Sequence, residues 1–413
     1  MRRVIITATA ALLLQGIAVQ AGTTSLRPVP RPPEILQAHQ QQQGFNRWRR
    51  GFERRARAQG ITPQTLTAAF QGVRFDPAII ARDRNQSEFN KTLWEYLDSA
   101  VSDRRVMNGR AALRDYLPVL RKIEARYGVE KEIVVAIWGL ESAFGSHRGR
   151  NDIVQSLATL AYEGRRGAFF EAQLIAALKI LQSGDTRARM MTGSWAGAMG
   201  HTQFMPTSYL SYAVDFTGDG RRDIWSDDPT DALASTAAYL AHFGWQRGQP
   251  WGVEVRLPEG FDFAQASRSI RKSPRAWAAL GVTGLSGQPV PHSAEASILL
   301  PAGASGPAFM IFKNFSVIER YNAADAYVIA VGHLGDRLRG GAAIQGAWPR
   351  GDRALTRAER ETLQRALTRA GFDTKGVDGR IGPNTVRAIR AFQRARGLAP
   401  DGYASLRLLE RLR

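Results

Sequence analysis

Hydrophobic residues follow a helical spacing over most of the chain. Between residues 131 and 144, Ile133, Ile137, Leu140 and Phe144 recur every three or four positions and form one apolar stripe. Glu141 lies at the edge of that stripe. Helical patterns also cover much of residues 45–128 and return over 323–338, so we expect a mainly α protein of the α+β class.

Two segments depart from this pattern. From residue 251 to about 315, apolar runs such as VEVRLP and FMIFKNFSV are broken by Gly and Pro, which predicts a small strand-containing insertion. Residues 354–413 hold three short helical stretches joined by Asp-Gly turns. We expect these residues to form a small three-helix domain.

The first 21 residues have the features of an export signal. Two arginines precede an apolar run, and small residues precede a cleavage site after Ala21. The run is shorter than the roughly 20 residues that span a bilayer. The chain also has no cysteine that could carry a lipid anchor or form a disulfide. We therefore expect a soluble periplasmic protein that is not membrane-anchored.

These patterns divide the chain into five parts. The predicted signal of residues 1–21 precedes a flexible Pro/Gln-rich linker at 22–44. A large helical domain spans 45–338, and a second, Gly-rich linker spans 339–353. The small C-terminal domain completes the chain.

The positive net charge of the chain limits the classes of partner that it is expected to bind. It has 56 Lys and Arg against 37 Asp and Glu, a net charge of +19, and removing Arg2 and Arg3 with the signal leaves +17. Such a surface attracts polyanions. For an exported protein, cell-wall polymers and anionic lipids are more available than nucleic acid, and the sequence has no nucleic-acid-binding motif. We expect no nucleic-acid partner.

The position of Glu141 makes it a candidate general acid. Partial burial disfavours the ionised carboxylate and raises the pKa, which keeps the group protonated near neutral pH. Gly145 is expected to end the helix and open space beside it. The alternative is a border residue of an amphipathic helix paired with an arginine, and for a Glu taken alone this alternative is the commoner one.

The surrounding motifs resemble those of a known enzyme family. The ESAFG helix end and the Gly-rich segment SWAGAMGHTQFMPTSY are similar to the lysozyme-like lytic transglycosylases, in particular the membrane-bound lytic transglycosylase B family and its soluble form. The resemblance covers roughly residues 45–338. It implies that this part is the catalytic domain and that Glu141 is its only catalytic carboxyl group.

Further motifs of the family imply substrate-binding residues, although each taken alone has a structural alternative. YEGRRGAFFEAQLIAAL supplies two arginines whose counterparts lie along the glycan groove. The Gly-rich segment supplies a serine and a glutamine whose counterparts contact the glutamate or the sugar, and ERYNAADAYVIAV returns to the site. The implied residues are Arg165, Arg166, Ser194, Gln203, Tyr321, Asn322 and Tyr327.

The single carboxyl group implies a reaction without water. Most glycosidases use two carboxyl groups. By resemblance, Glu141 protonates the β-1,4 bond between N-acetylmuramic acid and N-acetylglucosamine, then takes the C6 hydroxyl proton so that a 1,6-anhydro ring closes. One alternative is a hydrolytic muramidase with Asp152 or Glu163 as second carboxylate. The other is a non-catalytic peptidoglycan-binding protein, which the intact Glu141, Ser194 and Gln203 disfavour.

Residues 215–228, DFTGDGRRDIWSDD, resemble the start of an EF-hand calcium loop. Gly220 stands at the sharp turn, but Ser226 occupies the position of the bidentate glutamate, so Asp227, Asp228 or Asp231 would have to replace it. A related loop binds calcium in the soluble member of the family. An Asp/Gly turn without an ion is an equally good interpretation, and we expect no cofactor in catalysis. The candidate ligands are Asp215, Thr217, Asp219, Arg221 and Asp223.

The C-terminal domain resembles the peptidoglycan-binding domain of wall enzymes. Its DGRIGPNTVRAIRAFQ segment has the D-G-x-x-G-x-x-T-x-x-A-I-x-x-F-Q spacing. Arg387, Arg390 and Arg394 fall on one helical face, either as ligands for stem-peptide carboxylates or as a solvated charged face. The expected partners are glycan strands and stem peptides of peptidoglycan, bound by a monomeric enzyme whose local concentration the domain raises.

Overall fold

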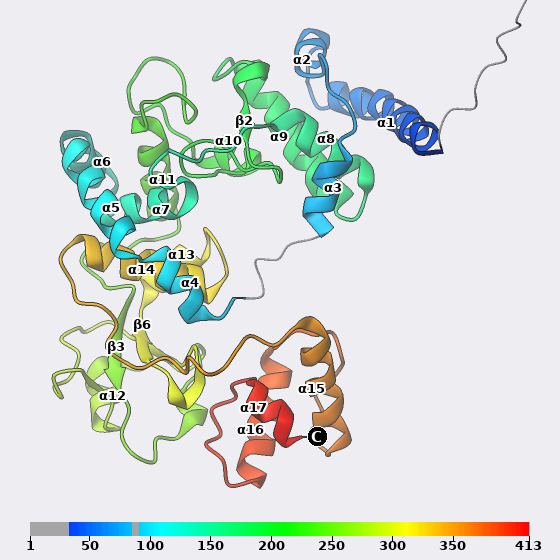
Figure 1. Cartoon of the computed structure of the whole chain (residues 1–413). Helices are drawn as coiled ribbons and strands as arrows, with labels where there is room; N and C mark the ends of the chain where they lie inside the picture. Colours follow the sequence, from blue (N-terminus) through cyan, green and yellow to red (C-terminus); the bar gives the residue numbers. More distant parts are fainter. Residues whose placement is uncertain (1–32, 85–90, 413) are drawn as a thin grey trace, which may run out of the picture.

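The computed structural model describes residues 33–84 and 91–412 (Figure 1). The predicted export signal lies outside the described residues, as does the first linker up to residue 32. Among the described helices, none combines the length and the apolar character that crossing a membrane requires.

The large domain is built from helices that surround α7. That helix is buried on nearly all sides and contacts α5, α6, α11 and α14, whereas α8 packs against α9 in a second group with α1 to α3 (Figure 1). A helix in such a position must be apolar all round, as IVVAIWG is. The helices are α1 (Pro33–Ala58), α2 (Pro63–Ala69), α3 (Pro77–Arg84), α4 (Leu93–Ala100), α5 (Asp103–Asp115), α6 (Leu117–Tyr127), α7 (Lys131–Ser142), α8 (Ile153–Glu163), α9 (Gly167–Ser183), α10 (Pro206–Tyr212), α11 (Thr230–His242), α13 (Lys313–Glu319) and α14 (Asp325–Leu338), with a 3-10 turn at Ala188–Met190.

The predicted linker at 22–44 is wrong for residues 33–44, which form the first turns of α1. Gln, Ala and Leu are good helix formers, and Pro33 stands at the first helical position, where its missing N–H costs nothing. The side chain of Gln42 accepts a hydrogen bond from the backbone of Phe75 at 3.1 Å. This part of the chain is therefore tied to the large domain.

The strand-containing insertion is confirmed as an antiparallel sheet with its own core. Its strands are β3 (Gly252–Arg256), β4 (Thr283–Gly284), β5 (Ser297–Leu299) and β6 (Ala308–Ile311), in the order β4-β3-β6-β5. The short helix α12 (Pro274–Ala279) places Trp277 in that core, and 3-10 turns lie at Phe263–Gln265 and Gly303–Ser305. A separate antiparallel pair of two-residue strands joins β1 (Asn151–Asp152) to β2 (Thr192–Gly193). β1 follows the end of α7 closely in sequence.

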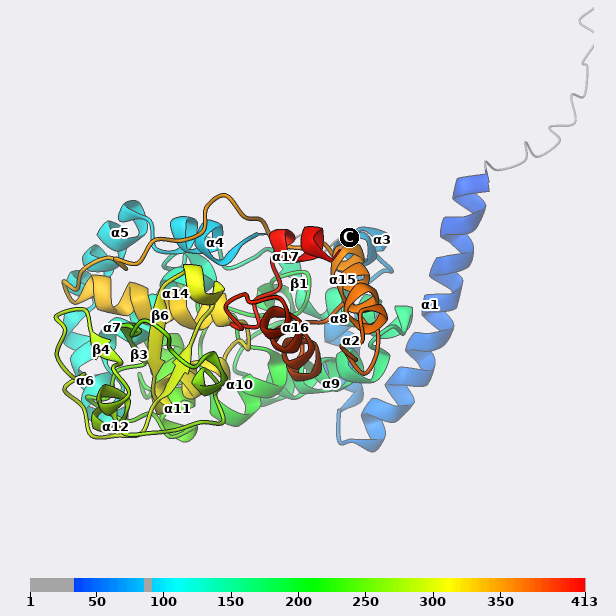
Figure 2. The same cartoon turned by 90° about the horizontal axis from the view of Figure 1, so that it is seen from below.

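The second linker is bound along the large domain. Residues 344–350 pass α4 before the chain enters the C-terminal domain (Figure 2). Trp348 packs on Trp94 with ring centroids 6.2 Å apart, and Arg350 pairs with Asp98 at 2.7 Å. A Gly-rich segment can adopt many arrangements, but these contacts hold this one on a single path.

The C-terminal domain has the three expected helices, α15 (Arg357–Arg369), α16 (Pro383–Ala395) and α17 (Leu406–Arg411). Leu363, Leu367, Ile389 and Phe392 belong to its separate core. The domain touches the strand insertion, because Asp401 accepts a hydrogen bond from the backbone of Ala304 at 2.8 Å. Arg390, one of the three arginines predicted to share a face, also donates to the carbonyl of Ala266 at 2.9 Å.

Candidate active site

The end of α7 presents Glu141 in the last helical turn. The helix stops at Ser142, earlier than the glycine at 145 predicted, because Ala143 and Phe144 already adopt left-handed backbone angles, with φ of 48° and 59°. The Ser142 hydroxyl accepts from the Gly145 N–H at 2.9 Å and donates to the His201 carbonyl at 2.5 Å. These bonds fix the direction in which the residue before Ser142 points.

Glu141 is half-buried, and its charge is not compensated. Burial raises the pKa of its carboxyl group to about 7, and a hydrogen bond from the Tyr327 hydroxyl to Oε1, 2.6 Å long, offsets part of that rise. Within residues 33–84 and 91–412, no Lys or Arg forms an ion pair with Glu141, so a role as an arginine-paired border residue does not fit. Such a carboxyl group is suited to give and take a proton near neutral pH.

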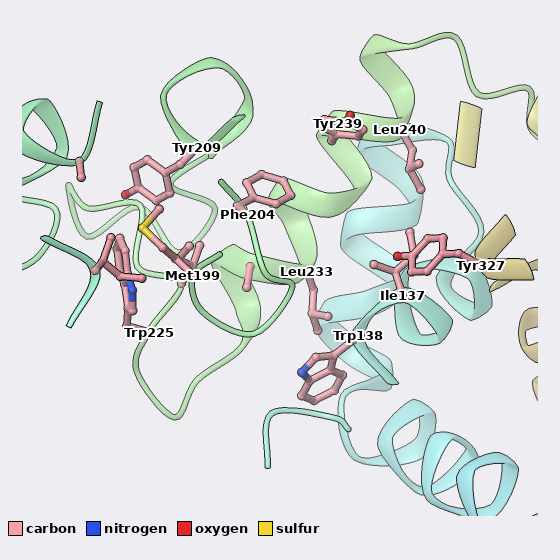
Figure 3. Close-up of a cluster of buried hydrophobic side chains, with 14 of the residues drawn as sticks. Ile137, Trp138, Met199, Phe204, Tyr209, Trp225, Leu233, Tyr239, Leu240 and Tyr327 are labelled. Atoms are coloured by element: carbon pink, nitrogen blue, oxygen red, sulfur yellow. The ribbon is translucent and has the colours of Figure 1, made fainter. Parts of the chain in front are cut away.

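Two tyrosines stand beside this carboxyl group. Tyr327, from the first turns of α14, is buried next to Ile137 of α7 (Figure 3). Tyr321 donates its hydroxyl to the carbonyl of Thr202 at 2.6 Å. Burial, and then the negative charge of Glu141, raises the pKa of both phenols. They therefore remain neutral hydrogen-bond donors.

The Gly-rich segment carries the predicted serine and glutamine, and both form hydrogen bonds with backbone groups nearby. Gln203 adopts a φ of 54° and donates through Nε2 to the carbonyls of Gly200 and Arg148, at 2.8 and 3.1 Å. The hydroxyl of Ser194 accepts from the Ala198 N–H at 3.0 Å. These bonds shape the loop, and contact of either residue with substrate stays a prediction.

The remaining predicted substrate-binding residues have local partners away from Glu141. Arg165 forms an ion pair with the buried Asp83, and Arg166 lies over the ring of Phe169, 4.3 Å from its centroid. Asn322 is exposed and accepts from the backbone of Ala324 at 3.0 Å. None of these contacts reaches Glu141, so a role for these residues in binding also stays a prediction.

The two candidates for a second carboxylate have structural partners. Asp152 caps α8 by accepting from the Gln155 N–H at 2.8 Å. Glu163 pairs with Arg84 at 2.9 Å and accepts from the backbone of Arg165, and these contacts lower the pKa of its carboxyl group. In the part of the chain that the structure describes, neither has a hydrogen bond or ion pair to the site around Glu141.

Comparison with known proteins now decides the family. A family model described as "Transglycosylase SLT domain" matches residues 44–336, and one described as "Putative peptidoglycan binding domain" matches residues 356–412. The chain belongs to the SLT transglycosylases. The expected lysozyme-like, mainly helical fold with a C-terminal peptidoglycan-binding domain is confirmed, as is the expected class of enzyme, a lytic transglycosylase.

Three relatives place this transglycosylase among those of type B. It is 35% identical over 250 residues to the membrane-bound lytic murein transglycosylase B of Escherichia coli, covering 59% of this chain and 66% of that protein. SltB3 of Pseudomonas aeruginosa, solved with NAG-anhNAM-pentapeptide, is 52% identical with a TM-score of 0.87, over 89% of this chain and 99% of that one. Slt35 of Escherichia coli, solved with calcium, is 30% identical with a TM-score of 0.61, over 72% and 92%.

A set of hydrogen bonds around His201, which the sequence did not predict, links α7 to the loops beside Glu141 in this transglycosylase. We call these bonds, among Trp138, His201 and Ser226, the brace. The Trp138 indole N–H donates to Nδ1 of His201 at 3.1 Å, so the imidazole proton lies on Nε2, which donates to the Ser226 carbonyl at 2.7 Å. Burial lowers the pKa of His201, consistent with a neutral ring. Arg148 donates to the Trp225 carbonyl at 3.0 Å. A single histidine in a Gly-rich segment gave no signal, because its partners are distant in sequence.

The EF-hand-like loop of residues 215–228 brings together only part of the predicted calcium-ligand set. Carboxylate oxygens of Asp215, Asp219 and Asp231 lie within 4.8 Å of one another. Asp231 is one of the three residues considered as replacements for the missing glutamate. Asp223 instead accepts from the backbone of Trp225 at 2.8 Å. Asp215 and Asp219 lie on the loop and Asp231 lies in the first turn of α11, and three carboxylates so placed fit a hard cation such as Ca²⁺.

Proposed function

We propose that this lytic transglycosylase cleaves the β-1,4 bond between N-acetylmuramic acid and N-acetylglucosamine without water, with Glu141 as its acid and base. The observation that carries the proposal is the half-buried carboxyl group of Glu141, whose pKa is raised to about 7 and which accepts a hydrogen bond from Tyr327. The relative SltB3 was solved with NAG-anhNAM-pentapeptide, a ligand with an anhydro sugar, and this supports an anhydro product here.

In the first step, protonated Glu141 gives its proton to the glycosidic oxygen as the bond to the anomeric carbon breaks. The N-acetyl group of the substrate stabilises the positive charge on that carbon. The carboxylate then takes the proton of the C6 hydroxyl, and O6 bonds to the anomeric carbon. One C–O bond breaks and another forms, so atoms balance without water. The hydrogen bond from Tyr327 stabilises the carboxylate between the two transfers.

The test is a digest of purified peptidoglycan by the mature protein and by Glu141→Gln, with the products weighed by mass spectrometry. We expect muropeptides one water lighter than hydrolysis products, absent with the variant. Full-mass products would instead establish a hydrolytic muramidase, and Asp152→Asn and Glu163→Gln would then identify the second carboxylate. Binding without any product from either protein would establish a non-catalytic peptidoglycan-binding protein.

We further propose that the enzyme acts in the periplasm as a monomer without a membrane anchor, in cell-wall turnover. The export-signal pattern of residues 1–21 and a polymer substrate outside the cytoplasm support this location. Cell fractionation with and without residues 1–21 tests the location, and size-exclusion chromatography with light scattering tests the monomer. Retention in washed membranes would contradict the absence of an anchor.

We also propose a structural calcium ion held by Asp215, Asp219 and Asp231, with no part in the reaction. The three clustered carboxylates support it, as does the relative solved with calcium. Calcium should raise the unfolding temperature of the parent but not of Asp219→Asn, an exposed residue whose carboxylate accepts only from the Arg221 backbone among the described residues. An equal rise in both proteins would overturn this site.

A further inference from the structure

The end of α14 that is remote from Tyr327 borders a cavity that the reaction does not use. The cavity, of about 680 Å³, lies between the last turns of α14, the start of β3 and the chain that leaves α14. This volume is in the usual range of small-ligand sites. Val253 and Leu285 give it an apolar side, whereas His333, Asp336 and Arg339 give it a polar one.

The polar side is held rigidly by Trp251. Gly332 allows the helix to lie against the indole ring, since a Cβ at that position would be 2.3 Å from it. The indole N–H donates to Oδ2 of Asp336 at 2.8 Å. This bond fixes the carboxylate and leaves Oδ1 with no hydrogen bond to any residue that the structure describes.

A short strap, residues 340–346, forms the outer wall. At its start the Gly341 N–H donates to the Asp336 carbonyl at 2.8 Å. At its end the carboxylate of Glu254 accepts from the backbone of Gln345 and Gly346, at 2.9 and 2.6 Å. Between these anchors lie Ala342, Ala343 and Ile344, and Ile344 packs against the core of the large domain, so the strap closes one side of the cavity.

Three side chains at the end of α14 and directly after it line the cavity. His333 makes no hydrogen bond to the described residues, and burial, followed by the charge of Arg337, lowers its pKa to about 4, so the ring is neutral. Asp336 follows one turn later with its free oxygen. Arg339, the residue after the last turn of α14, is exposed at the mouth and pairs with Glu132 at 3.9 Å, a pairing that a ligand carboxylate would share or replace. Residues three apart on a helix are neighbours, about 5–6 Å between Cβ atoms.

We propose that this cavity binds the zwitterionic end of a peptidoglycan stem peptide, where one carbon carries an amino group and a carboxylate. The ammonium group donates to Oδ1 of Asp336 and to a ring nitrogen of His333, and the carboxylate pairs with Arg339. The apolar side contacts the methylene chain of the diamino acid. The choice of a stem peptide rests on the proposed function, because peptidoglycan is the polymer that presents such an end.

The experiment is titration calorimetry on the full mature chain carrying Glu141→Gln, which removes turnover. The probe is the peptide Ala-γ-Glu-diaminopimelate, and the matched control is the same peptide with lysine, which lacks the terminal carboxylate. We expect the diaminopimelate peptide to bind about tenfold more tightly than the lysine peptide, as the loss of a charge-assisted hydrogen bond predicts. Arg339→Gln should remove that advantage, whereas Asp336→Asn should weaken the binding of both peptides by a similar factor, because both carry the ammonium group.

Arg104→Gln is the matched control, because it removes an exposed arginine on α5, away from the cavity. It should leave the affinity unchanged. Unchanged binding to Arg339→Gln and Asp336→Asn would overturn the proposal and place the peptide elsewhere. No binding by the parent would also overturn it, whereas anhydro products from the unmutated enzyme would still stand. Because Arg339 is exposed, Arg339→Gln should fold, and its affinity for the diaminopimelate peptide tests the proposal even if Asp336→Asn unfolds.

Discussion

Glu141 and Glu359 show what opposite surroundings do to the same side chain. Glu141 lies in the last turn of α7, half-buried, with one hydrogen bond and no cation, and its pKa is raised to about 7. Glu359 lies in the first turn of α15, bonded to Arg353 and to the Thr356 backbone, and its pKa is lowered to about 2. The negative end of a helix opposes a carboxylate, whereas the positive end stabilises it. The first arrangement suits proton transfer near neutral pH, whereas the second stabilises the start of a helix.

Glu141→Gln should produce the largest effect. Loss of the general acid lowers cleavage by about a thousandfold. Because the folded pKa lies above the ordinary value of about 4.3, ionisation of Glu141 costs stability that grows as pH rises from about 4 through 7. The variant should therefore unfold at a higher temperature than the parent at pH 8 and at a similar temperature at pH 4. An equal gain at both pH values would contradict the raised pKa.

Tyr327→Phe should have the next largest effect, through the hydrogen bond to Glu141. Loss of this bond lowers cleavage by about tenfold, since the carboxylate between the two proton transfers is less stable. It also raises the pKa of Glu141, so the alkaline fall of kcat/KM should move to higher pH. The measurement is a pH profile of both proteins on soluble muropeptides. A profile that falls at the same pH would show that Tyr327 does not act on this carboxyl group.

His201→Phe should weaken the brace beside the site, because the buried Trp138 N–H loses its acceptor. The cost of such an unpaired group is about 1–3 kcal/mol, which a lower unfolding temperature and reduced kcat should report. His201→Gln retains an acceptor and a donor and should recover most of both losses. Equal behaviour of the two variants would mean that only the volume of the ring matters.

Glu359→Gln should have the smallest effect and serves as the counterpart of Glu141→Gln. Glutamine still completes the capping box with Thr356, so only the exposed ion pair with Arg353 is lost, and exposed ion pairs contribute little to stability. Thr356→Ala removes the cap and should cost about 1 kcal/mol. Hydrogen exchange of the α15 amides measures both, and cleavage of soluble substrate should not change. The contribution of Glu359 is present above pH 4 and is lost as pH falls through about 2.

Much of the fold could be predicted because it depends on local pattern. The apolar stripe of α7, the strand insertion and the three C-terminal helices all followed from spacing and turn residues. Residues 33–44 did not, since a Pro/Gln-rich composition is shared by linkers and helix starts; in the structure they continue α1, and Gln42 accepts a hydrogen bond from Phe75. The end of α7 was also misplaced, because its left-handed turn depends on contacts with His201 rather than on Gly145 alone.

The sequence by itself determined the family and the two-domain plan and indicated Glu141 as the candidate general acid, because each is written in motifs of contiguous residues. The tertiary structure alone decided which side chains meet. It brought Tyr327 into a hydrogen bond with Glu141 across 186 positions, Arg165 into an ion pair with Asp83, and Trp138 into a hydrogen bond with His201. Burial and hydrogen bonding set the proton affinity of a carboxyl group, and both depend on residues that only folding brings together.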